Sequence, residues 1–189
     1  NGCSMAAVKN GQSMDTTMGF TPLEGLLMGT RSGDLDPSLI LYIMGKEGLT
    51  VGEANTLLNK HSGLIGISGE SSDMREILSA VKDNQQRSKW AFEIFCYRIK
   101  KYVGAYSAAM GGLDALVFTG GIGENSKEVR EEVCKEMEFL GIHLDDLKNQ
   151  NADEIISTEN SKVKVMRIPT NEELVIALDT AKIVSEMQK

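Results

Sequence analysis

The sequence predicts an α/β fold, in which strands alternate with helices that cover a sheet. The short apolar run at 115–119 and the alternating charged and apolar residues at 162–168 are typical of strands. Between them lie longer segments with helical periodicity, of which residues 85–110 form the longest. A glycine-rich turn separates the run at 115–119 from a charged, helix-like segment at 127–140. This alternation of strands and helices is the pattern of α/β layer folds.

The chain is expected to open with a β-hairpin. Asn10 and Gly11 are a favoured pair for a type I′ turn, because both central positions of that turn need φ > 0. The flanking strands are expected over residues 4–9 and 12–16. A long connection follows, with a short helical piece expected at residues 22–28.

Two helix starts then follow from capping residues. Asp36 and Pro37 begin a helix, with proline in its first turn. The segment from Thr50 to Glu53 is a capping box that begins the next helix, which is expected to end at Gly63.

The remaining elements alternate between strands, helices and turns. In chain order we expect a short strand or turn at 64–68, a helix from Ser71 or Ser72 to Val81, a helix at 85–110, a strand at 115–119, a helix at 127–140 closed by Gly141, a polar surface loop at 144–154, a strand at 162–168, and a final helix with Thr170 or Asn171 as N-cap.

Composition limits the kinds of partner. The chain has 189 residues, which suits one domain, and a formal net charge of −7 with a pI near 5.0. Such an acidic chain is a poor non-specific partner for nucleic acid or an anionic membrane. It contains neither a membrane-length apolar run nor a signal-peptide pattern. Its three cysteines show no CxxC spacing and suit a reducing compartment, so we expect a cytoplasmic protein without a zinc site.

The glycine-rich turn is the first candidate site. Glycine permits φ > 0 and lets a ligand approach the backbone, and ligands of α/β sheets bind at the carboxyl ends of strands. Gly121 and Gly123 match only the first half of a dinucleotide fingerprint, because the third glycine would fall at Ser126. The chain has no P-loop motif. From these residues alone, a packed turn and a nucleotide-binding loop are equally good interpretations.

Four longer motifs carry a resemblance to the acetate kinase family. They are MDTTMGFTPLEGLLMGTRSGDLDP at 14–37, GISGESSDMRE at 66–76, FTGGIGENS at 118–126 and IPTNEELVIALDT at 168–180. The resemblance covers the whole chain, and kinases for propionate and butyrate are the nearest alternatives. It implies a ribonuclease-H-like domain of the actin-like ATPase superfamily, with a mixed β-sheet flanked by helices. It also implies that residues 1–189 are the C-terminal nucleotide-binding domain of a two-domain kinase, with an N-terminal domain preceding Asn1.

The resemblance also assigns roles to residues. Arg31 matches a catalytic arginine, and a planar guanidinium suits the oxygens of a transferring phosphoryl group. Without the resemblance, the sequence favours a surface Arg31 that pairs with Asp34 or Asp36. Glu172, rather than Glu173, matches a metal-binding carboxylate, although a glutamate there also suits a helix N-terminus.

The remaining matches concern the nucleotide. Asp73, Met74 and Arg75 match a segment that lines it, although Asp73 could simply cap a helix. The segment Gly121, Ile122, Gly123, Glu124 and Asn125 matches the adenosine-side loop. Asn1 and Gly2 match the end of a phosphate-binding turn.

The implied activity is reversible transfer of a phosphoryl group from ATP to acetate, giving acetyl phosphate and ADP, with Mg²⁺ or Mn²⁺ as cofactor. The resemblance implies a homodimer formed through this domain, and no nucleic-acid or membrane partner. Taken alone, the chain could instead be a nucleotide-binding and dimerisation module without turnover. A non-enzymatic chaperone-like or actin-like lobe is a weaker alternative, because the segments around Arg31 and Glu172 resemble the kinase specifically.

Overall fold

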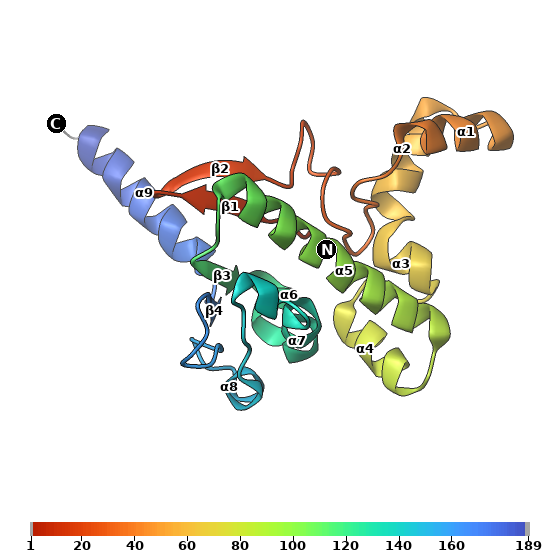
Figure 1. Cartoon of the computed structure of the whole chain (residues 1–189). Helices are drawn as coiled ribbons and strands as arrows, with labels where there is room; N and C mark the ends of the chain where they lie inside the picture. The colour runs from red at the N-terminus through yellow and green to blue at the C-terminus, as the bar shows by residue number, and fades with distance from the viewer. Residues whose placement is uncertain (1, 188–189) are drawn as a thin grey trace.

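The computed structural model describes residues 2–187, with only the backbone described at Glu172 (Figure 1). It opens with the expected hairpin of β1 (Ala6–Lys9) and β2 (Gln12–Thr16), which pair antiparallel. Asn10 and Gly11 have φ values of 54° and 76°, as the type I′ turn requires. No helix forms at residues 22–28, where the chain makes a series of turns and bends, so that expectation is wrong.

Helices α1 (Pro37–Glu47) and α2 (Val51–Lys60) begin where their capping residues predict. The Asp36 side chain accepts a hydrogen bond from the Ser38 amide, and both hydrogen bonds of the Thr50–Glu53 capping box are present. Gly63 does not close α2 but begins α3 (Gly63–Ser68). Residues 64–68 are therefore helical rather than a strand or turn, because their apolar side chains pack against α5 and the run is too short for periodicity to show this.

Helix α5 (Gln86–Met110) is the central element of the fold. It packs against α3, α4 (Met74–Lys82) and α7 (Lys127–Cys134), as Figure 1 shows. Asp73, not Ser71 or Ser72, is the N-cap of α4. The α5 face that points into the core supplies Ala91, Phe95, Cys96, Ile99 and Val103.

The second half of the chain forms a parallel β-α-β unit. Strand β3 (Ala115–Phe118) pairs with β4 (Lys164–Arg167), and the crossover contains α6 (Gly120–Asn125), α7, the 3₁₀ helix η1 (Glu138–Leu140) and α8 (Asp146–Asn151). The single helix expected at 127–140 is interrupted after Cys134, where Glu136 adopts φ 59°. The expected surface loop at 144–154 contains α8, whose Asn149 is 2% exposed.

The last helix, α9 (Glu172–Met187), projects from the body of the molecule in Figure 1. The Asn171 side chain accepts a hydrogen bond from the Leu174 amide at 3.0 Å, so Asn171 is the capping residue of the two expected. Within residues 2–187, no helix combines the length and apolar character needed to cross a bilayer.

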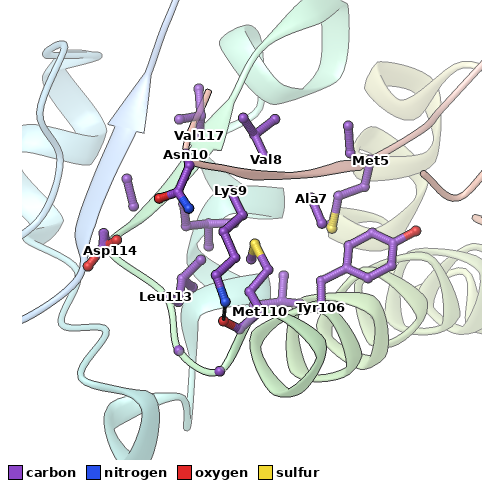
Figure 2. Close-up of a pocket in the computed structure, with 16 residues that line it drawn as sticks. Met5, Ala7, Val8, Lys9, Asn10, Tyr106, Met110, Leu113, Asp114 and Val117 are labelled. Atoms are coloured by element: carbon purple, nitrogen blue, oxygen red, sulfur yellow. Dashed lines mark hydrogen bonds between the residues drawn. The ribbon is translucent and has the colours of Figure 1, made fainter. Parts of the chain in front are cut away.

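The two small sheets do not hydrogen-bond to each other in the described part of the chain. A cavity of about 560 Å³ lies between β1, the C-terminal end of α5 and β3 (Figure 2). Lys9 reaches along it, and its Nζ donates a hydrogen bond to the Met110 carbonyl at 2.6 Å. None of the residues proposed above as site residues lines this cavity.

Candidate functional site

The glycine-rich segment after β3 is the helical turn α6, and not the open loop that its composition suggests. Three glycines in six residues make a poor helix, at about 0.8–1.0 kcal/mol each relative to alanine. Thr119 precedes the helix and gives it no side-chain cap. Contacts from elsewhere in the fold must therefore hold this segment in shape.

Each glycine of α6 stands in a different environment. Gly120 has φ 70°, which favours glycine for backbone reasons. A Cβ on Gly123 would lie 3.2 Å from the Phe118 carbonyl carbon, so close packing against β3 accounts for that glycine. Gly121 has a negative φ, and a Cβ there would meet no atom within 4 Å. Neither backbone conformation nor packing within the described chain explains Gly121, which has open space beside it.

Glu124 ties α6 to the segment before α9. Its Oε1 accepts hydrogen bonds from the Gly120 amide at 2.9 Å, the Thr170 amide at 2.8 Å and the Thr170 hydroxyl at 2.9 Å. The Thr170 and Gly120 donors lower the pKa of the Glu124 carboxyl. The Glu124 side chain is therefore used within the protein, and it places residues 168–171 beside α6.

Arg31 lies on a loop that the start of α3 holds in place. The amides of Leu64 and Ile65 donate to the carbonyls of Met28 and Gly29 at 2.9 and 3.0 Å. Gly63 has φ 64°, and a Cβ there would lie 2.2 Å from the Met28 carbonyl oxygen. The close backbone approach at this junction therefore requires glycine.

The Arg31 guanidinium has no carboxylate partner among the described residues. Its Nη1 donates to the Pro22 carbonyl at 3.1 Å and lies 3.4 Å from the Met28 sulfur. A Cβ placed on Gly2 would lie 3.8 Å from the same Nη1, so the structure brings Gly2 and Arg31 together. The alternative pairing of Arg31 with Asp34 or Asp36 does not occur, because both carboxylates are used elsewhere.

Asp34 fixes the loop on its far side. One carboxylate oxygen accepts the Gly25 amide at 2.8 Å, and the other accepts the Tyr102 hydroxyl at 2.6 Å. Arg98 forms an ion pair with the same carboxylate at 3.4 Å and donates to the Asp34 carbonyl at 2.9 Å. Burial, and then the Asp34 carboxylate, raise the pKa of Tyr102, which keeps the phenol a donor.

The predicted nucleotide residues of α4 are separate from α6 in their contacts. Asp73 accepts the Arg75 amide at 2.9 Å and forms an ion pair with its guanidinium, which holds the pKa of Asp73 down to about 2. Met74 is 4% exposed and packs in the core, so its side chain is not available to a ligand. No hydrogen bond or ion pair between described residues joins this cap to α6.

Two predicted positions are outside what the structure describes. Asn1 and the side chain of Glu172 lie outside the described residues, and the Glu172 backbone begins α9. Among the described side chains, no group of three or more His, Cys, Asp or Glu gathers to hold a metal ion.

Sequence reasoning missed Arg130 and Asn149, which contact each other directly beside α6. Arg130 is 1% exposed and donates hydrogen bonds to the carbonyls of Gly123 and Glu124, both at 2.9 Å. The one available signal was its position in KEVREEVC, between Val129 and Val133 on the buried face of α7. Asn149 was hidden in a segment that looked like polar surface.

Solved structures of two kinases have the same overall fold as this chain. The chain superposes on the acetate kinase of Porphyromonas gingivalis with a TM-score of 0.94 and 52% identity, covering 97% of this chain and 47% of that one. For a propionate kinase from Francisella tularensis the TM-score is 0.89 and the identity 48%, with coverage of 94% and 46%. The chain is thus an α/β protein with the fold of these kinases, which confirms the expected fold class.

The sequence places the chain within that group. Residues 1–178 match the Acetokinase family, and an acetate kinase from Carboxydothermus hydrogenoformans is 58% identical over 97% of this chain. The chain belongs to the acetokinase family, as the resemblance implied. It spans about half the length of the curated relatives that it matches, for example 46% and 48% of the first two.

Proposed function

We propose that this chain is the nucleotide-binding part of an acetate kinase, which transfers a phosphoryl group between ATP and acetate. The observation that carries the proposal is the open space beside Gly121, which lies just after the carboxyl end of β3, where ligands of α/β sheets bind. A base or phosphate could approach the backbone there without meeting a Cβ. The relatives named acetate kinase support ATP and acetate as the substrates.

Arg31 would serve the transferring group. Its guanidinium has no carboxylate partner among the described residues, so its charge is available to an anion. In phosphoryl transfer, catalysis is mainly positioning and charge stabilisation, and an arginine in this role contributes about 10³–10⁵ in rate. The Asp34 network and the start of α3 would hold the Arg31 backbone in place while the acceptor carboxylate attacks in line.

Glu124 and Thr170 would orient the second half of the site. Their hydrogen bonds fix residues 168–171 against α6, and Glu172 follows directly. A magnesium ion, when bound, supplies positive charge that offsets the phosphate oxygens. Asp73 and Arg75 would reach the nucleoside from α4, once a ligand competes for their mutual ion pair.

The acceptor and the assembly are further parts of the proposal. A propionate kinase among the similar structures makes propionate the second candidate acceptor. Assembly as a homodimer would use apolar side chains that this chain exposes, among which Leu39, Leu41 and Tyr42 of α1 are 49%, 68% and 63% exposed. A cytoplasmic location would suit such an enzyme.

The test compares Arg31→Lys with Arg87→Lys in the full-length protein, by measuring acetyl phosphate formed from acetate and ATP. Arg87 donates to the Ile67 carbonyl at 2.8 Å, so its replacement controls for loss of an arginine–carbonyl contact. We expect Arg31→Lys to lose about 10³-fold or more in kcat, with the control nearly unchanged. Equal activity of the two variants would refute the role of Arg31. Propionate replaces acetate in a parallel assay.

A further inference from the structure

The side chain of Arg130 is an unusual feature beside the proposed site. It is 1% exposed, and no carboxylate forms an ion pair with it among the described residues. Buried charges in proteins are normally paired, because removing a cation from water is costly. Burial and the charge of Arg167 lower the pKa of the Arg130 guanidinium.

Oxygen atoms from two elements surround the guanidinium instead. Nη1 donates to the carbonyls of Gly123 and Glu124, both at 2.9 Å. Nε donates to Asn149 Oδ1 at 2.7 Å, and Nη2 donates to the Asn149 carbonyl at 3.1 Å. Asn149 is itself buried, and its Nδ2 donates to the Lys127 carbonyl at 3.1 Å. The planar guanidinium thus joins the last turn of α6 to α8.

This contact falls on the element that most needs support. Helix α6 is six residues long with three glycines and no side-chain cap, so it is unstable as an isolated helix. Glu124 holds its first amide, at Gly120, and Arg130 holds the carbonyls near its end. The backbone between these two anchors includes Gly121, whose free side would face the nucleotide.

We propose that Arg130 is a positioning residue for nucleotide binding: it fixes the carbonyl end of α6 so that the backbone at Gly121 is held ready for the ligand. This inference rests on the proposed function. Arg130 does not touch the nucleotide in this account, because its side chain is buried and its donors are engaged with protein oxygens. Lysine at this position keeps the charge but cannot reach α6 and Asn149 together through a planar fork.

The experiment uses the 189-residue chain, with Arg130→Lys and the matched control Arg87→Lys. Arg87 also donates to carbonyls of a short helix, at Gly66 and Ile67 in α3, but it does not contact α6. The affinity for Mg·ADP is measured by calorimetry, folding by thermal melting, and order in α6 by amide hydrogen exchange. We expect Arg130→Lys to weaken Mg·ADP binding by about tenfold or more and to speed exchange in 121–125, with the control within about twofold.

The outcomes separate this inference from the proposed function. A folded Arg130→Lys chain that binds Mg·ADP within about twofold of the parent would overturn the inference. If the parent chain itself binds no Mg·ADP, the proposal that this chain binds the nucleotide is refuted. The exchange measurement still tests Arg130 in that case, because unchanged exchange in 121–125 of the Arg130→Lys variant would refute its positioning role. If Arg130→Lys does not fold, Asn149→Ser removes the Oδ1 acceptor and leaves Arg130 in place. This variant should weaken binding by a few fold, and unchanged affinity would contradict the inference.

Discussion

Replacement of Gly63 by alanine should destabilise the chain far more than the same change at Gly48. Both glycines adopt the left-handed backbone conformation, with φ values of 64° and 67°. This conformation costs alanine about 1–2 kcal/mol. The loss of conformational entropy in the unfolded chain is the same for both substitutions. The backbone cost therefore cancels when the two variants are compared.

Their surroundings differ. A Cβ on Gly48 would meet nothing within 4 Å, whereas one on Gly63 would lie 2.2 Å from the Met28 carbonyl oxygen and 2.8 Å from that of Arg31. Those oxygens belong to backbone that the Leu64 and Met28 amides hold by hydrogen bonds, so the loop must move. Overpacking of this kind costs about 1–3 kcal/mol. We expect a loss of about 1–2 kcal/mol for Gly48→Ala and about 2–5 kcal/mol for Gly63→Ala.

Urea unfolding, followed by circular dichroism, gives both free energies of unfolding if the transitions share one m-value. Equal losses for the two variants, within about 0.5 kcal/mol, would show that α3 does not hold the Arg31 loop as closely as described. In the full-length protein, Gly63→Ala should also lower phosphoryl transfer, since it displaces the backbone at Arg31.

Three further predictions follow from single contacts. Thr50→Ala removes the capping box of α2 and should cost about 0.5–2 kcal/mol in urea unfolding, whereas Thr56→Ala, which removes only a hydroxyl contact within the helix, should cost less. Burial raises the pKa of the Cys134 thiol from 9.0 to about 12. The buried group stays protonated while the unfolded thiol ionises, so stability should fall as the pH rises from 9.0 towards 12, and Cys134→Ala should flatten that fall in alkaline melts. NMR titration of Asp73 should give a pKa near 2 that Arg75→Ala raises towards 3.8; a value unaffected by that change would contradict the ion pair.

Local signals in the sequence were enough for elements whose boundaries depend on neighbouring residues. Asn10 and Gly11 fix the hairpin turn through their own φ preferences, and Asp36 and Thr50 cap the helices that follow them. Helix α3 could not be predicted in the same way, because a run of only five residues, LIGIS, is too short to show a period, and the helix depends on its packing against α5. The break in the helix expected at 127–140 could not be predicted either, because no glycine or proline lies between Lys127 and Glu136.

The candidate site likewise has parts that local sequence signals indicated and parts that they could not indicate. Residue types indicated a possible ligand loop at 120–125, and the resemblance supplied Arg31, but neither indicated what holds them. The supporting contacts join residues far apart in the chain, such as Glu124 with Thr170 and Arg130 with Asn149. Asn149 lies in a polar segment whose burial depends on the fold around it, so no local pattern could have identified it.

The central claim is that the open side of Gly121 receives the nucleotide, and Gly121→Ala tests it most directly. Alanine suits the negative φ and the helical position of this residue. The variant should therefore be as stable as the parent, or more stable by up to about 1 kcal/mol in the free energy of unfolding, and its melting temperature should not fall. The account predicts that this folded chain binds Mg·ADP at least about tenfold more weakly than the parent in calorimetric titration. Unchanged affinity in the folded variant would contradict the account, because the space beside Gly121 would then hold no nucleotide.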